Sequence, residues 1–121
     1  MRGAITVSGN TEEEIISATE ELLVKLIELN QINPDSVGSA FISTTEDINA
    51  AFPAKALRKF EGWMYVPVMC MREMPVPNSL EMCIRIMMHV NTDKPQEEIV
   101  HVYLRGATVL RPDLGLGNRE D

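Results

Sequence analysis

The feature that most constrains the fold is an alternating apolar segment in the second half of the chain that is interrupted by one arginine. In residues 83–90, CIRIMMHV, the apolar residues Ile84, Ile86 and Met88 occupy every second position. A period of two predicts a β-strand with one face in the hydrophobic core. Arg85 then lies in the middle of the strand, on the opposite face and between apolar neighbours. A guanidinium in that position is either paired with a carboxylate or available to an anionic ligand.

A second apolar run, residues 65–73 (YVPVMCMRE), ends on Glu73 and could supply that carboxylate. On the residues alone, two interpretations of Arg85 and Glu73 remain open. They could form an ion pair that only joins two strands, or they could belong to a binding or catalytic site.

The remaining elements follow from periodicity and from turn residues. A helix is predicted from the capping-box pattern of Thr11 and Glu14 to about Asn30, with apolar residues recurring on one face. Pro53 fits the first turn of another helix over 54–60, which Gly62 ends. Short helical turns are expected over 45–49, 78–82 and 95–98. Strands are predicted over 2–8, 37–44, 65–70, 84–90 and 99–110, the last bent at Gly106, and a weakly ordered tail from about residue 112.

Strands and helices in this order predict an α/β (α+β) fold, with a mixed sheet and helices packed on one face. At 121 residues the chain is expected to form a single domain over 1–121. Too few helices remain to cover the other sheet face. We therefore expect that face to be covered by other copies of the chain.

Charge and composition argue against several classes of function. The net charge of −7 disfavours nucleic-acid binding, which needs a basic face. No apolar run approaches the ~20 residues that cross a bilayer, so a cytoplasmic protein without membrane association is expected. Cys70 and Cys83 form no CxxC pattern, and His89 and His101 show no metal-ligand spacing. We expect free thiols, structural histidines, and neither metal nor cofactor.

Nothing in the sequence indicates a nucleophile elbow, a phosphate-binding loop or a dinucleotide fingerprint. The groups that remain for chemistry are arginine, glutamate, tyrosine and the backbone. They suit a reaction that moves charge without a nucleophile or a proton transfer.

Several ordered blocks resemble one family over nearly the whole chain. They are RGAITV, TEEEI, FPAKALR, GWMYVPVMCMREM, CIRIMMHVNTD and HVYLRGATVLRPDL. Together they resemble the monofunctional chorismate mutases of the trimeric α/β class. The resemblance implies the Claisen rearrangement of chorismate to prephenate in phenylalanine and tyrosine biosynthesis. It also implies a homotrimer around a barrel-like centre, with active sites in clefts between subunits.

The resemblance assigns roles to particular residues. Arg85 resembles the group beside the ether oxygen of the substrate, and Glu73 the carboxylate near the ring and its hydroxyl. Arg2 and Tyr103 resemble groups that bind a substrate carboxylate and the side-chain end. Met69 stands where a small hydroxyl residue is often found. Further substrate-binding positions are expected at Met69, Cys70, Met71, Arg72, Phe52, Lys55, Arg58, Leu110 and Arg111.

Lys55 and Arg58 are three residues apart and share a helix face, and spacing alone favours a solvated surface over a substrate contact. An alternative function is a trimeric protein that binds a dicarboxylate without turning it over. A structural oligomer without a ligand would leave the arginine within the apolar pattern unexplained.

Overall fold

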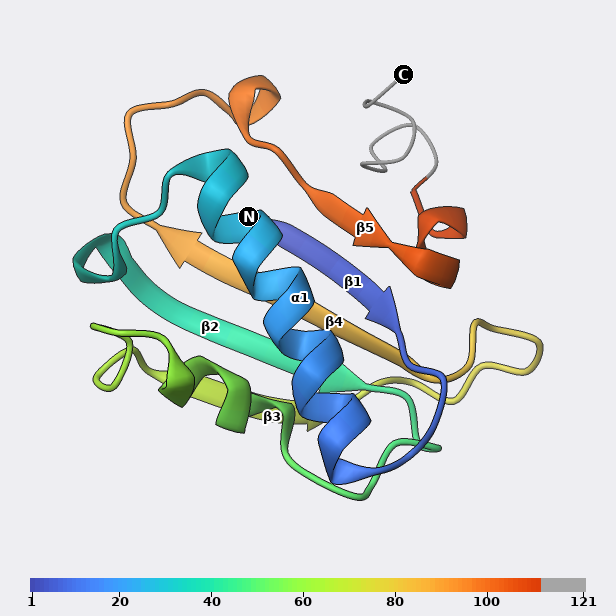
Figure 1. Ribbon diagram of the computed structural model, residues 1–121. Helices are drawn as coiled ribbons and strands as arrows, with labels where there is room; N and C mark the ends of the chain where they lie inside the picture. The colour runs from blue at the N-terminus through green and yellow to red at the C-terminus, as the bar shows by residue number, and fades with distance from the viewer. Residues whose placement is uncertain (112–121) are drawn as a thin grey trace.

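The computed structural model describes residues 1–111, which form a five-stranded mixed sheet in the order β3-β2-β4-β1-β5. β4 runs antiparallel to both β1 and β2, whereas β5 is parallel to β1 and β3 is parallel to β2. Figure 1 shows β4 near the middle of the sheet, between β1 and β2. The strands are β1 Arg2–Thr6, β2 Val37–Thr44, β3 Val68–Arg72, β4 Cys83–Val90 and β5 Val102–Leu104.

One long helix, α1 (Glu12–Asn30), crosses the sheet. The side chain of Thr11 accepts a hydrogen bond from the backbone N–H of Glu14, as the capping pattern predicts. Glutamates 12 to 14 place negative charge at the positive end of the helix dipole. Gln31 ends the helix in the left-handed conformation (φ 51°), with its N–H bonded to the carbonyl of Ile27.

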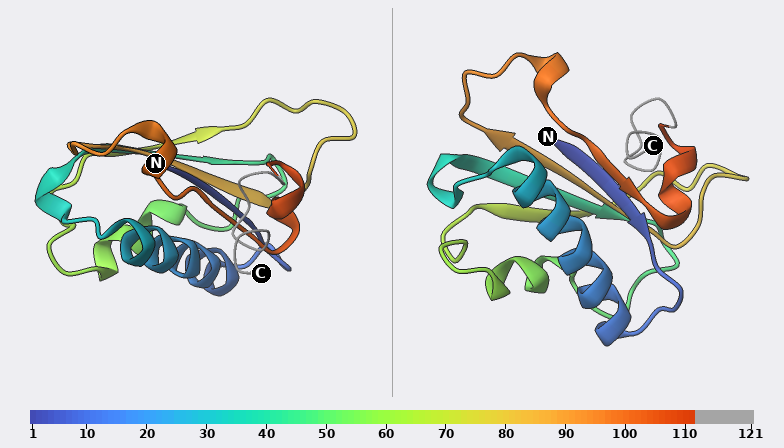
Figure 2. Two further views of the ribbon diagram at one scale, coloured as in Figure 1. Left: turned by 90° about the horizontal axis from the view of Figure 1, so that it is seen from above. Right: turned by 45° about the horizontal axis from the view of Figure 1, so that its top comes forward.

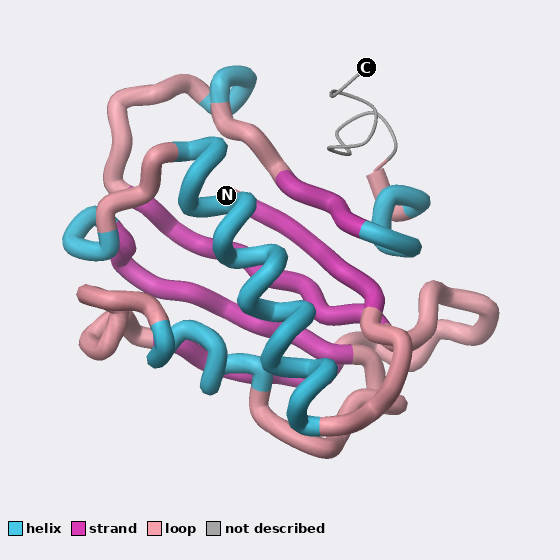
Figure 3. Tube along the Cα trace, viewed as in Figure 1, coloured by secondary structure: helices cyan, strands magenta, loops and turns pink. Residues whose placement is uncertain are grey.

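The core lies between α1 and the sheet. Leu22 and Leu26 of α1, and Ile5, Ile42 and Ile84 of the strands, are all fully buried. Burying a side chain of this size stabilises the fold by roughly 1.5–3 kcal/mol. Figure 3 shows the helix lying diagonally across the strands.

The helices that pack on the sheet lie on one face, as predicted. These are α1 and the 3₁₀ helix η2 (Pro53–Lys59), and Figure 2 shows both on the same side. Residues 1–111 contain three shorter 3₁₀ helices: η1 Pro34–Ser36, η3 Gln96–Glu98 and, directly after β5, η4 Arg105–Val109.

Strand register decides which side chains share the other face, called here the open face. Cross-strand partners point to the same side of a sheet. Ala4 is paired with both Arg85 and Tyr103, and Arg85 is also paired with Ser43. By the same rule the open face carries Arg2, Phe41, Met69, Met71 and Met87.

Gly3 lets α1 and β5 approach the first strand closely. A Cβ at this position would lie 2.7 Å from the carbonyl oxygen of Val102 and 2.9 Å from Cδ1 of Leu22. Any larger residue would push β1, which carries Arg2, away from its neighbours.

Several predicted elements differ from those observed. The third strand begins at Val68 rather than Tyr65, because Val66 N–H bonds to the carbonyl of Trp63 in a turn and Pro67 follows. The fifth strand ends at Leu104, since Arg105 has φ 54° and the backbone continues as η4. The helix expected over 54–60 is the 3₁₀ helix η2.

The segment 78–82 is not helical, and its Asn78 and Met82 both have positive φ. Residues 46–47 form a turn rather than a helix. The expected turn before residue 99 is present as η3. The tail predicted from about residue 112 lies outside the described residues.

Candidate active site

Arg85 and Glu73, the two charged residues that interrupt the apolar runs, lie next to each other. Nε of Arg85 is 3.3 Å from Oε2 of Glu73. The Arg85 side chain is 46% exposed and that of Glu73 is 31% exposed, so the pair is not buried. A half-exposed pair of this kind contributes little to stability, typically 0–1 kcal/mol. A guanidinium carries five donors, so this contact leaves Arg85 able to bind an anion as well.

Arg85 faces a hollow of about 560 Å³ above the open face, within the usual size range for small-molecule sites. We call it the open-face hollow. Arg2, Arg85 and Arg111 give it three guanidinium groups, and Tyr103 adds a phenol. Such a set favours a ligand with more than one negative charge. Its lining also includes the predicted residues Met71 and Leu110.

Arg2 is held in place by its own backbone. Its N–H donates to Nδ1 of His101 at 3.1 Å. Next to it, Met1 donates its terminal amine to the carbonyl of Met88 at 2.7 Å, and Met88 N–H donates back to Met1 at 2.8 Å. Burial, and then the charge of Arg2, lower the pKa of the Met1 amine. His101 thus has a structural contact, as expected from the sequence.

A second hollow of about 520 Å³ lies at the β3 edge of the sheet, and we call it the edge hollow. It is lined by the predicted residues Phe52, Lys55, Cys70, Met71 and Arg72. Cys70 and Arg72 alternate with Met69 and Met71 along β3, so they point away from the open face. Met71 lines both hollows.

Lys55 forms an exposed ion pair in the edge hollow. Its Nζ lies 2.8 Å from Oε2 of Glu12 at the start of α1. The hydrogen bond from Lys55, and then its charge, hold the pKa of the Glu12 carboxyl below its ordinary value. This ammonium group can reorient toward an anion, since both partners are largely in solvent.

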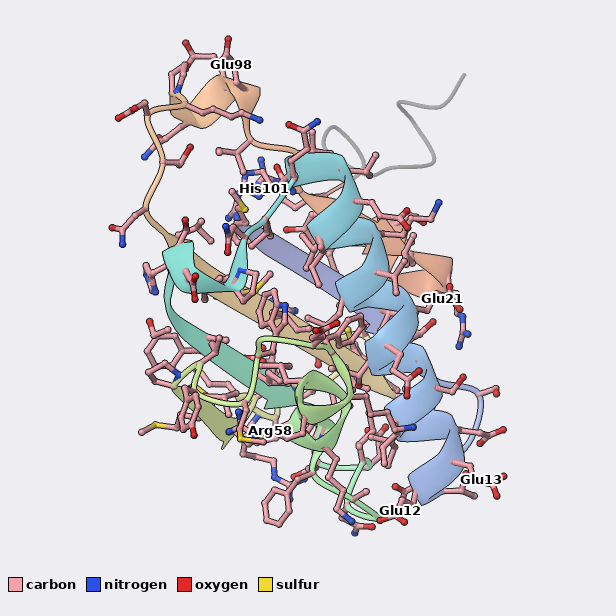
Figure 4. The ribbon with its side chains drawn as sticks, turned by 60° about the vertical axis from the view of Figure 1, so that its left-hand side comes forward. Glu12, Glu13, Glu21, Arg58, Glu98 and His101 are labelled. Atoms are coloured by element: carbon pink, nitrogen blue, oxygen red, sulfur yellow. The ribbon has the colours of Figure 1, made fainter. Side chains whose placement is uncertain are left out.

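Three predicted residues line neither hollow: Glu73, Arg58 and Met69. Glu73 is connected to the open-face hollow through its contact with Arg85. Arg58 donates from Nη1 to the carbonyls of Trp63 (3.1 Å) and Met64 (2.8 Å), so within one chain it stabilises the loop before β3. Figure 4 shows Arg58 beside this loop, far from His101. Met69 is 59% exposed on the open face and paired with Phe41.

Both cysteines are free thiols. Cys83 is buried two residues before Arg85 and packs against Ala4, Tyr103 and Ala107. Burial raises the pKa of the Cys83 thiol, and the charge of Arg85 opposes that rise. A thiol of raised pKa is a poor nucleophile at neutral pH, which fits a site without covalent chemistry.

Among the residues that line the open-face hollow, sequence reasoning missed three whose side chains share the open face with Arg85: Phe41, Ser43 and Met87. Their alternation within β2 and β4 was visible in the sequence. Their position beside Arg85 was not, because it depends on which strands pair and in which register. The contact between His101 and Arg2 joins residues 99 positions apart and carried no sequence signal.

Within residues 1–111, no three His, Cys, Asp or Glu side chains gather in a way that could hold a metal ion. The same residues contain no helix that is both long and apolar enough to cross a bilayer.

The fold and the site together define a small α+β protein with an arginine-rich hollow on an uncovered sheet face. The family model for chorismate mutase type I matches residues 1–114. A chorismate mutase of Bacillus subtilis (strain 168) is 54% identical over 116 residues, covering 96% of this chain and 91% of the relative. A chorismate mutase of Thermus thermophilus is 48% identical, covering 94% and 93%.

The solved structure of a chorismate mutase from Clostridium thermocellum is also similar. It has a TM-score of 0.87 and 51% sequence identity, and the match covers 90% of this chain and 96% of that one. The chain therefore belongs to the chorismate mutase type I family, an isomerase class. The resemblance seen in the sequence is confirmed, and the catalytic interpretation is favoured over a dicarboxylate-binding protein without activity.

Proposed function

We propose that this protein rearranges chorismate to prephenate in the open-face hollow, with Arg85, Glu73 and Arg2 as its catalytic residues. One observation carries the assignment of the site. Arg85 faces a hollow that also contains Arg2, Tyr103 and Arg111, with Glu73 at 3.3 Å from its guanidinium. The family membership supports the reaction itself.

The chemistry needs positive charge in a fixed position. Chorismate carries two carboxylates and must fold into a chair-like conformer before its carbon–oxygen bond breaks. Arg2 and Arg111 would hold carboxylates and select that conformer, which lowers the entropic part of the barrier. Tyr103 would contact the side-chain end of the substrate.

Arg85 would act on the transition state. As the ether bond breaks, partial negative charge develops on its oxygen and partial positive charge on the ring. A guanidinium beside that oxygen stabilises charge that is fully developed only at the barrier, so it raises kcat. Glu73 would accept a hydrogen bond from the ring hydroxyl, face the positive ring and orient Arg85. No bond to the protein forms, and no metal or cofactor is required.

The remaining residues would complete the site from a second copy of the chain. Phe52, Lys55, Cys70 and Arg72 line the edge hollow rather than the open-face hollow. We propose a homotrimer in which the edge hollow of one subunit, with Met69 and Arg58 near it, meets the open-face hollow of the next. The uncovered open face, with Met71 and Met87 exposed at 43% and 40%, supports such an association.

For the cellular setting we propose a cytoplasmic enzyme of aromatic amino-acid biosynthesis, with chorismate and prephenate as its small-molecule partners. The net charge of −7 supports a protein that does not bind nucleic acid.

Purified protein mixed with chorismate tests the reaction. We expect loss of the absorbance of the substrate diene in proportion to enzyme concentration, with prephenate as the product by chromatography. Binding of chorismate in calorimetry without any loss of absorbance would contradict catalysis and support a binding protein instead.

A further inference from the structure

A polar cluster at the end of β2 joins the ends of two other strands. Thr45 Oγ1 accepts a hydrogen bond from Cys83 N–H at 3.0 Å and donates its own proton to Oδ1 of Asp47. The Asp47 carboxylate accepts the N–H of Met82, at 3.0 Å for Oδ2 and 3.2 Å for Oδ1. We call Thr45 and Asp47 the strand-end clamp. Neither residue lines the open-face hollow or the edge hollow.

The same short segment also holds the end of β3. Glu73 N–H donates to the carbonyl of Thr44 at 2.8 Å, and Nη1 of Arg72 donates to the carbonyl of Thr45 at 3.3 Å. Thr45 N–H in turn donates to the carbonyl of Cys83 at 3.1 Å. The backbone of Glu73 and the backbone of Cys83, two residues before Arg85, are therefore both hydrogen-bonded to residues 44–45.

The loop between these two strands gives little support of its own. Figure 1 shows residues 74–82 projecting beyond the sheet, and Met74 and Val76 are 72% and 54% exposed. Met82, the last residue before β4, has φ 50°, a conformation that costs free energy for a residue with a side chain. Its N–H is the group that Asp47 binds, so the clamp holds the chain where it is strained and where β4 begins.

We propose that Thr45 and Asp47 are positioning residues for catalysis, which set the separation of Glu73 and Arg85 by holding the end of β3 and the start of β4 together. This inference rests on the proposed function of that pair. If Arg85 were displaced, Arg2 and Arg111 would still bind the substrate carboxylates, whereas the contact of Arg85 with the ether oxygen in the transition state would be lost. The clamp therefore acts on kcat more than on KM.

The test compares Thr45→Val, which removes the hydroxyl at nearly constant shape, with Thr45→Ser, which keeps it. We expect Thr45→Val to lower kcat roughly ten- to hundredfold with KM changed by less than about threefold, and Thr45→Ser to restore most of the activity. Thr92→Val is a matched control, because Thr92 Oγ1 accepts a backbone N–H from Lys94 in a loop away from both hollows. Its kcat should equal that of the wild type.

A double-mutant cycle with Glu73→Gln separates positioning from general loss of structure. If the clamp acts through Glu73 and Arg85, Thr45→Val should change kcat by less than about threefold once Glu73 is Gln. Equal effects in both backgrounds, or an unchanged kcat in Thr45→Val alone, would overturn the proposal. If Glu73→Gln by itself keeps full activity, the role assigned to that pair is wrong as well. Failure of the wild type to convert chorismate would instead refute the proposed function.

Discussion

At the residue scale, the site depends on where each guanidinium is held, since all arginines carry the same charge. Arg85 contacts Glu73 and faces the open-face hollow, whereas Arg105 pairs with Glu21 on α1 at 2.8 Å. Both are arginine–carboxylate pairs with half-exposed side chains. Of these two pairs, only the one with Arg85 borders the open-face hollow.

Arg85→Lys keeps the charge but replaces a planar fork with a flexible point charge. We expect kcat to fall by ~10²–10³, close to the effect of Arg85→Ala, because a preorganised donor is lost. Steady-state kinetics with chorismate measures this change. Arg105→Lys is the matched control and should leave kcat unchanged, since a surface pair with Glu21 tolerates either cation. An Arg85→Lys enzyme with more than a tenth of wild-type kcat would argue against charge stabilisation by this residue.

At the element scale, α1 is built from local signals and then tied to η2. Its N-cap bond from Glu14 N–H to Thr11 Oγ1 is 3.2 Å long. The ion pair of Lys55 with Glu12 joins the first turn of the helix to η2. The ion pair lies at the edge hollow, because both Glu12 and Lys55 line it.

Thr11→Ala should lower the free energy of unfolding by about 1 kcal/mol, because the N–H of Glu14 loses its capping partner. Thr11→Ser should retain most of that stability. Denaturant titration at constant protein concentration gives both values, and kcat should be unaffected by either change. Equal stability of the Ala and Ser variants would show that the cap contributes nothing.

The Glu12–Lys55 pair also predicts a pH effect. The pKa of Glu12 is lower in the folded protein than the ordinary value of 4.5, so the contribution of Glu12 to stability is present above that value. It is lost as the pH falls from 4.5 through the folded pKa. Lys55→Gln should raise the pKa of Glu12 toward 4.5 and remove this dependence. NMR titration of the Glu12 carboxyl measures the shift, and an unchanged pKa would contradict the pairing.

At the scale of the whole molecule, one chain has two separate hollows that are lined by predicted site residues. The open-face hollow has the arginines, and the edge hollow has Phe52, Lys55 and Cys70. Joining them within a closed ring of three copies would bury the uncovered sheet face and complete each site. Light scattering should then report about 40 kDa, three times the 13.5 kDa of one chain.

Mixing two inactive variants tests whether different copies complete each site. Arg85→Ala damages the open-face hollow, and a Phe52→Ala, Lys55→Ala double variant damages the edge hollow. After the chains are mixed and exchanged, about a quarter of the sites would combine two intact halves, so we expect about a quarter of wild-type activity. Mixed samples that stay inactive after verified exchange would mean that each site comes from one chain.

Local patterns predicted those elements whose signals lie close together in the chain. The capping pair of Thr11 and Glu14, the apolar face of α1 and the alternation around Arg85 all reappear in the structure. Predictions failed where backbone conformation overrode the pattern. Arg105 takes a positive φ and ends β5, and the turn from Trp63 to Val66 delays β3.

The sequence by itself determined the mixed α+β architecture, the helices on one face and the presence of an arginine within an apolar strand. Periodicity and capping are local properties, so residues a few positions apart encode them. Only the tertiary structure decided which side chains share the open face, that Arg58 stabilises a loop, and that Thr45 and Asp47 bind the backbone where β4 begins. Those contacts depend on strand order and register, which bring together residues up to a hundred positions apart.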